Sequence, residues 1–190
     1  MKKLILCLLV LVFLGFVFAE EKYEIAGITG VDILGLKKPI SSLMITVRGV
    51  SLGNTLEEAM QMLGKTKTDL RKDINYWWLE VEPGLKFRID KKEKKVEAFI
   101  IDEKFKEHLQ GATASLFNLK EASTMDIYLE LCFGRPDKIR IHDPESVIDR
   151  IDAITYFTGF SFSRYFDSKN KNFFTIMQIT FPELLKEAQK

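Results

Sequence analysis

The stretch Thr55–Thr66, TLEEAMQMLGKT, decides the fold because it holds the start, the apolar face and the end of one short helix. Thr55 is a good N-cap residue, and Glu58, three residues on, completes a capping box. Gly64 can adopt the left-handed conformation that ends a helix. Four residues at i, i+3, i+4 and i+7 give the helix one apolar face: Leu56, Ala59, Met60 and Leu63. A helix of about two turns is too short to be stable alone, so we expect it to dock on another element.

The residues that follow predict the sheet on which this helix packs. Segment 76–90, YWWLEVEPGLKFRID, contains two alternating apolar and polar runs separated by the turn signal Pro83–Gly84. Segment 91–95, KKEKK, is expected at a hairpin tip, and segment 96–102, VEAFIID, as the returning strand. A helix followed by an antiparallel meander is an α+β unit whose helix covers one face of the sheet.

The stretch Ser123–Pro136, STMDIYLELCFGRP, repeats the layout of the first helix. Ser123 or Thr124 is expected to cap this second helix, and Gly134 is expected to end it before the proline. Its apolar face is expected to contain Ile127, Tyr128 and Leu131.

A second set of strands is predicted after this helix. An insertion at 140–152 comes first, and Pro144 can begin another short helix there. Segment 153–167 then predicts a strand pair or one bent strand. Residues 168–172 form a polar tip, and 173–181 predict a strong returning strand.

Matching residues relate the two halves of the chain. Gly64 corresponds to Gly134, Gly84 to Gly159 and Phe87 to Phe162, with offsets of 70, 75 and 75 residues. The sequence therefore predicts an α+β protein of two related units, each a short helix packed on an antiparallel β-meander, after an N-terminal signal peptide. The predicted parts are a strand and loop segment at 20–48, a first unit at 49–102, a connector at 103–119 and a second unit at 120–190.

The first nineteen residues predict export. Lys2 and Lys3 precede an apolar run, Leu4–Ala19, whose 16 residues fall short of the roughly 20 that a membrane span needs. Small residues before Glu20 suit cleavage after Ala19, so 1–19 reads as a secretory signal peptide and the mature protein as periplasmic or secreted. The alternative is an uncleaved anchor, the one way in which we expect this chain to contact a membrane.

The segment before the first unit predicts little regular structure. Residues 20–41 suggest a weak strand or two and a loop, whereas 42–50, SLMITVRGV, alternate as a strand does. Leu43, Ile45 and Val47 are expected on one face of that strand. The connector could hold a short helix at 103–111, with Phe105 and Leu109 on one side.

Charge and cysteine content exclude several classes of function. The chain has 28 basic and 27 acidic residues, so removal of two lysines with residues 1–19 leaves a net charge of −1. A nucleic-acid partner is not expected, because such binders usually show a basic excess. The mature chain keeps one cysteine, Cys132, so no internal disulfide can form and the core must hold by packing.

The sequence contains few residues that suit enzyme catalysis. Cys132 as nucleophile with His142 as base would make a small exported hydrolase, the alternative that the sequence leaves open. A lone cysteine on a helix is more often buried and structural. His108 and His142 are the only histidines and lie far apart, so no metal is expected. No phosphate-binding loop or GxSxG motif is present, so we expect no cofactor and no catalytic residue.

Aromatic residues give the best candidates for a binding site. Tyr76, Trp77 and Trp78 are consecutive on a predicted strand, so Trp77 faces opposite to its neighbours. We expect Trp77 in the core and Trp78 on an uncovered sheet face. The expected binding residues are Trp78, Tyr76, Tyr156 and Tyr165, whereas Phe87 and Phe162 are expected to be buried.

The order of helix, LG, aromatic strand, PGL or TGF, FxxD and charged tip resembles the repeat of β-lactamase inhibitory proteins. It is also similar to the single unit of the small outer-membrane lipoproteins of the β-barrel assembly machinery, although the lipoprotein cysteine is missing. The resemblance covers Gly49–Phe181 and implies a non-catalytic protein that binds other proteins across a sheet face or loops. No binding residue is carried over from either family. The predicted function is an exported, non-enzymatic binding module with a protein partner in the cell envelope or outside the cell.

Overall fold

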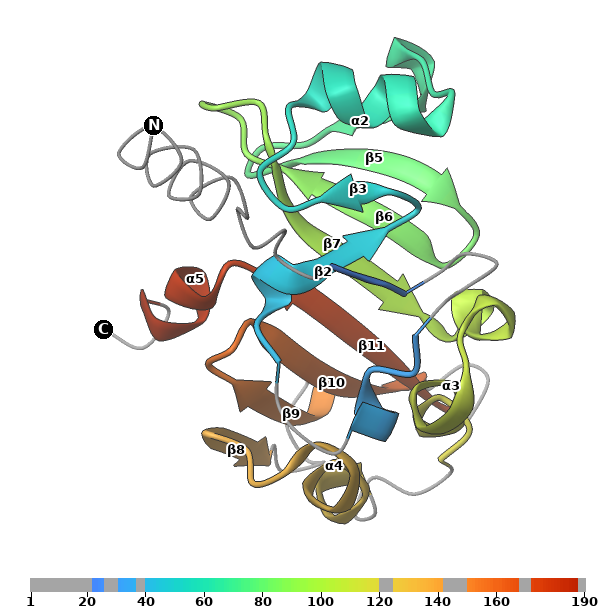
Figure 1. Cartoon of the computed structure of the whole chain (residues 1–190), viewed down its shortest axis with the longest axis vertical. Helices are drawn as coiled ribbons and strands as arrows, with labels where there is room; N and C mark the ends of the chain where they lie inside the picture. The colour runs from blue at the N-terminus through green and yellow to red at the C-terminus, as the bar shows by residue number, and fades with distance from the viewer. Residues whose placement is uncertain are drawn as a thin grey trace, which may run out of the picture.

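The central element of the protein is an eight-stranded antiparallel sheet (Figure 1). The computed structural model describes residues 22–25, 31–36, 40–119, 125–141, 150–167 and 172–187. The strand order is β4-β5-β6-β7-β11-β10-β9-β8. The bounds are β4 (Leu70–Lys72), β5 (Trp77–Glu82), β6 (Leu85–Ile89), β7 (Val96–Asp102), β8 (Lys138–Ile141), β9 (Arg150–Tyr156), β10 (Phe160–Asp167) and β11 (Asn172–Thr180).

Two antiparallel meanders meet in the middle of this sheet. β4 to β7 pair in chain order, and so do β8 to β11. β7 and β11 join them, with Ile101 opposite Met177. The α+β class is thereby confirmed, as are the strand pair predicted at 153–167 and the returning strand predicted at 173–181.

Helix α2 (Leu56–Leu63) forms as the sequence predicts. Thr55 Oγ1 accepts a hydrogen bond from the backbone N–H of Glu58 (3.2 Å), and the Glu58 carboxylate accepts one from the backbone N–H of Thr55 (2.8 Å). Gly64 ends the helix with a φ of 62°. Leu56 and Ala59 are buried, and the two other residues of the predicted apolar face pack half-buried against the core.

Helix α4 (Met125–Phe133) buries a different face from the predicted one. Met125, Leu129 and Phe133 are fully buried, whereas Ile127 and Leu131 are 59% and 76% exposed. The cause is the composition of α4, which has apolar residues all round, so spacing alone does not select the buried stripe. Gly134 follows the helix with a φ of 90°, as expected. The predicted N-cap residues, the helix predicted at Pro144 and the polar tip at 168–171 lie outside the described residues.

The N-terminal segment adds a second, three-stranded sheet. β1 (Tyr23–Glu24) pairs in parallel with β2 (Ile45–Val47), which pairs antiparallel with β3 (Val50–Ser51). The strand predicted at 42–50 is therefore shorter than expected. Ser42–Met44 is a 3-10 helix, η2, in which Leu43 is 41% exposed rather than on the buried face with Ile45 and Val47. The Ser42 hydroxyl donates to the carbonyl of Thr180 (2.6 Å), which ties η2 to the end of β11.

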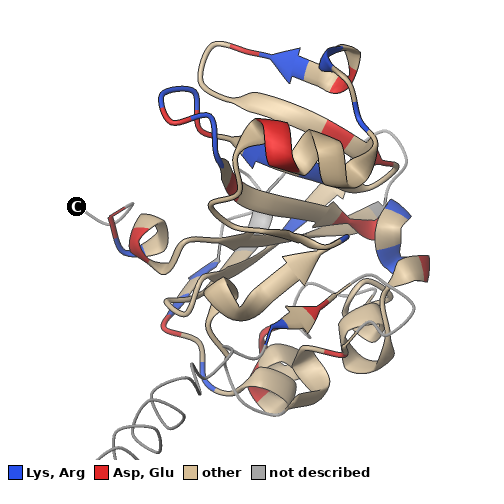
Figure 2. Cartoon of the chain, turned by 45° about the horizontal axis from the view of Figure 1, so that its top comes forward, with Lys and Arg blue, Asp and Glu red and all other residues tan. Residues whose placement is uncertain are grey.

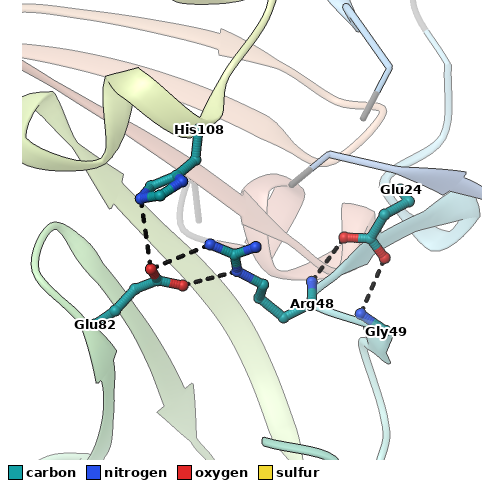
Figure 3. Close-up of polar contacts among 5 residues, drawn as sticks. All are labelled: Glu24, Arg48, Gly49, Glu82 and His108. Carbon is teal, nitrogen blue, oxygen red and sulfur yellow. Dashed lines mark hydrogen bonds and ion pairs between the residues drawn. The ribbon is translucent and has the colours of Figure 1, made fainter. Parts of the chain in front are cut away.

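A polar network fastens the three-stranded sheet to β5, as Figure 3 shows. The Glu24 carboxylate accepts hydrogen bonds from the backbone N–H groups of Arg48 (2.7 Å) and Gly49 (2.9 Å). The Arg48 guanidinium makes a two-pronged contact of 2.7 and 3.1 Å with Glu82, and His108 Nε2 lies 3.6 Å from the same carboxylate. Four charged or ionisable side chains thus hold segments that are distant in sequence.

The region between the meanders contains one predicted and one unpredicted helix. Glu103–His108 is a 3-10 helix, η4, with Phe105 and Leu109 buried as expected. Helix α3 (Gly111–Leu116) was not predicted. Asp32 caps it from the N-terminal segment, accepting hydrogen bonds from the backbone N–H groups of Ala112 (2.7 Å) and Thr113 (2.9 Å). The other short elements are η1 (Leu34–Leu36), η3 (Lys67–Asp69) and α5 (Pro182–Glu187).

The core lies on one face of the large sheet. α2, the three-stranded sheet, α3 and α4 gather on that face (Figures 1 and 2). Every second residue of β5, β6, β10 and β11 is directed toward them, and these are the buried ones; they include Leu79, Phe87, Phe162 and Met177. The prediction that Phe87 and Phe162 are buried is confirmed.

Candidate binding face

The second face of the large sheet carries a half-exposed row of side chains from one edge to the other, whereas Ala98, Ala153 and Thr180 on the same face are buried. Register places one continuous row of side chains across seven strands: Glu80, Lys86, Ile100, Gln178, Ser161, Thr155 and Lys138. Each alternates with core residues and is half-exposed. We call this face, with the residues in register above and below the row, the open face. Because antiparallel sheets can leave one side to solvent, this row is a surface that the described part of the chain offers a partner.

Trp77 and Trp78 take opposite sides of β5, as predicted. Trp77 pairs with Ile89 and packs half-buried against the core, with the Lys72 ammonium 4.7 Å from its ring centroid. Trp78 pairs with Arg88 on the open face and is half-exposed. Trp77 is less deeply buried than expected, because β5 lies next to the short edge strand β4.

Trp78 is held in a fixed position by its surroundings. Its indole Nε1–H donates to Asp73 Oδ2 (2.8 Å), and the exposed Tyr76 ring meets it edge-on with centroids 6.1 Å apart. The backbone N–H of Tyr76 and the Trp78 indole lower the pKa of Asp73, so the acceptor is a carboxylate at neutral pH. The Arg88 guanidinium stacks 4.7 Å from the Tyr76 ring centroid and is paired with Glu97 at 3.1 Å.

A shallow pocket of about 350 Å³ opens beside Trp78. Ile100 and Ile176 are the aliphatic side chains of its lining, and Arg71, Lys86 and Glu80 lie among its charged residues. Lys86 and Glu80 pair with each other at 3.3 Å. An aliphatic and aromatic lining with charged residues around it suits a single anchoring side chain from a partner.

A second aromatic pair lies on the other meander. Tyr165 on β10 stacks against Phe174 on β11, with ring centroids 5.2 Å apart and an angle of 13° between the planes. Both rings are half-exposed on the open face. Phe174, Ile100 and Ile176 were missed by the sequence reasoning. Alternation within 96–102 and 173–181 is the signal that would have assigned them, once one core residue of each strand was known.

Tyr156 is not on the open face, which corrects its expected place among the binding residues. Its side chain is 1% exposed, and it pairs with Phe160 on the core side of β9. Its hydroxyl donates to the carbonyl of Gly134 (2.8 Å), and its ring meets Phe133 edge-on at 4.9 Å. Burial raises the pKa of Tyr156, so the phenol stays protonated. Tyr156 therefore faces α4 and the core rather than the open face.

Of the two residues of the enzymatic alternative, Cys132 and His142, only Cys132 lies within the described residues. Cys132 lies half-buried on α4 and packs against the core beside Tyr128. Burial is the main cause that raises the pKa of Tyr128, and the nearby Cys132 raises it further. The Tyr128 hydroxyl donates to the carbonyl of Ala112 (2.7 Å). His142 lies outside the described residues.

The described ranges between 22 and 187 offer little other chemistry. No group of three histidine, cysteine or acidic side chains there could hold a metal ion. No helix in the same part of the chain has the length and apolar character that a membrane crossing requires. The chain matches no protein-family model, no curated protein and no solved structure.

Proposed function

We propose that this chain is an exported, non-enzymatic protein that binds another folded protein across its open face. The observation that carries the proposal is the width of that face. Eight strands about 4.8 Å apart span about 34 Å. With strands about 20 Å long the face covers roughly 700 Å², close to the roughly 800 Å² that each partner buries in an interface of standard size.

The proposal includes two related units that together make this width. Gly64 and Gly134 follow α2 and α4 with φ values of 62° and 90°, and Gly84 and Gly159 occupy hairpin turns with φ values of 82° and 109°. One meander alone would be about 14 Å wide, too narrow for a standard interface. Duplication of the unit therefore gives the chain a surface that neither half has.

The anchors of the proposed site are aromatic and sit on both meanders. Trp78 and Tyr76 lie on one side of the β7–β11 junction, and Tyr165 with Phe174 lies on the other. Rings of this kind carry much of the binding energy in protein interfaces. Small polar residues between them, such as Ser161, allow a partner to approach the strands closely.

The experiment that tests the function is site-specific photo-crosslinking in the native host. A photoreactive amino acid at Ser161 samples the middle of the open face, and one at Gln61, exposed on α2, is the matched control. We expect a discrete protein adduct from position 161 only, and its loss when Trp78→Ala is added. Equal adducts from both positions, or an adduct that persists without Trp78, would contradict the proposal.

Export is proposed separately from the sequence of 1–19. Mass spectrometry of the protein recovered from the envelope or the medium should give an N-terminus at Glu20. An intact N-terminus in the membrane fraction would favour an uncleaved anchor instead.

A further inference from the structure

Both edge strands of the large sheet carry basic side chains on the open face. On β4, Arg71 pairs with Trp78 and lines the pocket beside it. On β8, Lys138 pairs with Thr155 and Arg140 with Ala153, which places both on the same face. Figure 2 shows the basic β4 at the margin of the sheet. These charges also discourage strand addition at the edges, but that effect does not require them on one particular face.

Among the described residues, the marginal charges differ from those in the middle of the face in having no counter-ion. Lys86 is paired with Glu80 and Arg88 with Glu97. Arg71, Lys138 and Arg140 make no ion pair with any other described residue, and Arg71 and Arg140 are exposed. The charge of these three side chains is therefore available to a partner, whereas Lys86 and Arg88 are already paired. Arg71 shares its pocket with Asp73 and Asp102, which accept hydrogen bonds from the Trp78 indole and the backbone N–H of Lys104.

This arrangement opposes a second copy of the chain as the occupant. In a two-fold face-to-face dimer whose strands are aligned, β4 of one copy lies over either β4 or β8 of the other. Either alignment brings basic margins together, and like charges across an interface weaken it. The occupant has to differ from this chain in charge.

We infer, on the basis of the proposed function, that the partner is a protein with acidic side chains at two places about 34 Å apart, on either side of a neutral centre. The two acidic places lie over β4 and β8. The neutral centre lies over the serine, threonine and isoleucine side chains of β7, β9, β10 and β11. Charge at the margins then sets the orientation and specificity of the complex, and the aromatic anchors supply the affinity.

The test uses the protein identified by the Ser161 adduct, purified, and measures its affinity for the full mature chain at several salt concentrations. The variant is the triple change Arg71→Glu, Lys138→Glu and Arg140→Glu. Its control reverses three exposed lysines away from the open face: Lys92, Lys104 and Lys186. Loss of three ion pairs of ordinary strength at the margins should weaken the affinity of the triple variant by about tenfold or more and make it less dependent on salt. The affinity of the control variant should stay within about twofold of wild type.

The outcomes separate this inference from the function on which it rests. An unchanged affinity and salt dependence in the triple variant would overturn the acidic-partner inference and leave the proposed function standing. Absence of a Trp78-dependent adduct at Ser161 would end both. A wild-type dimer in sedimentation velocity that Trp78→Ala dissolves would overturn the inference in favour of self-association. So would binding to phosphatidylglycerol vesicles that the triple variant abolishes, because the basic margins would then serve a membrane surface.

Discussion

The indole of Trp78 donates a 2.8 Å hydrogen bond to Asp73, a carboxylate that also accepts from the backbone N–H groups of Asn75 and Tyr76. One acidic side chain thus orders the turn before β5 and fixes the ring on the open face. A ring already held in one orientation loses less entropy when a partner covers it. Trp78 is therefore already ordered for the proposed binding, whereas its neighbour Trp77 packs against the core.

Alanine substitution should separate these two tryptophans. Trp77→Ala removes a ring packed against the core and should lower the free energy of unfolding by about 2–3 kcal/mol, less than full burial would give. Trp78→Ala removes a half-exposed ring and should cost about 1 kcal/mol or less. Urea unfolding followed by far-ultraviolet circular dichroism measures both. Unfolding of the chain by Trp78→Ala would assign this ring to the core rather than to binding.

Asp32 should make the stability of the α3 region depend on pH. Burial raises the pKa of Asp32, but hydrogen bonds from Ala112, Thr113 and Gly35 lower it by more, so the pKa lies below its ordinary value of 3.8. A lowered pKa means that the ionised form stabilises the fold above about pH 4 and that this contribution is lost as the pH falls further. Asp32→Ala should cost about 1–2 kcal/mol at pH 7, as for other lost caps, and less near pH 2.

The control for Asp32 is Asp32→Asn. The amide keeps one acceptor oxygen and carries no charge, so at pH 7 its cost should be smaller than that of Asp32→Ala. Because the wild-type carboxylate loses its stabilising charge at low pH, the cost of Asp32→Asn should also fall near pH 2. A cost for Asp32→Ala that does not change between pH 7 and pH 2 would contradict the role of the charge.

Two glycines with positive φ should respond differently to alanine. An added Cβ at Gly84 would lie 2.4 Å from the backbone nitrogen of Phe105, whereas one at Gly64 would meet nothing within 4 Å. Gly64→Ala carries only the backbone strain of the left-handed region, about 1 kcal/mol. Gly84→Ala adds a collision with backbone and should cost about 3 kcal/mol or more. Equal costs in thermal unfolding would show that the hairpin turn can move away from η4.

Cys132 should be dispensable. It is half-buried on α4, so Cys132→Ala is a small truncation expected to cost about 1 kcal/mol. Partner affinity should be unchanged in the same protein. Loss of function at full stability would instead favour the hydrolase alternative, in which this thiol reacts.

Local signals predicted the parts of the fold that local contacts determine. The capping box of Thr55 and Glu58, the left-handed Gly64 and the alternating strands all depend on residues close in sequence, so the sequence alone was sufficient. The alternation of Trp77 and Trp78 likewise assigned opposite faces. The number of helices available to cover the sheet predicted that one face is open, but nothing in the sequence decided whether Trp77 or Trp78 lies on it.

Long-range contacts explain the errors. α4 has apolar residues on every side, and only its docking on the sheet selects Met125, Leu129 and Phe133 over Ile127 and Leu131. α3 depends on a cap, Asp32, that lies far away in the chain. In the candidate site, Tyr156 was misplaced because an aromatic residue on a strand signals burial and binding equally well.

The pairing of β7 with β11 has a consequence for how the chain reaches its native state. β11 lies at the centre of the sheet, although it follows all the other strands in sequence. The meander β4–β7 can form while its central margin is still unpaired, and that margin stays a free strand edge until β11 arrives. Closure therefore depends on contacts between residues far apart in the chain, which fold slowly. During folding, this interval is when the chain is most exposed to pairing with the wrong strand.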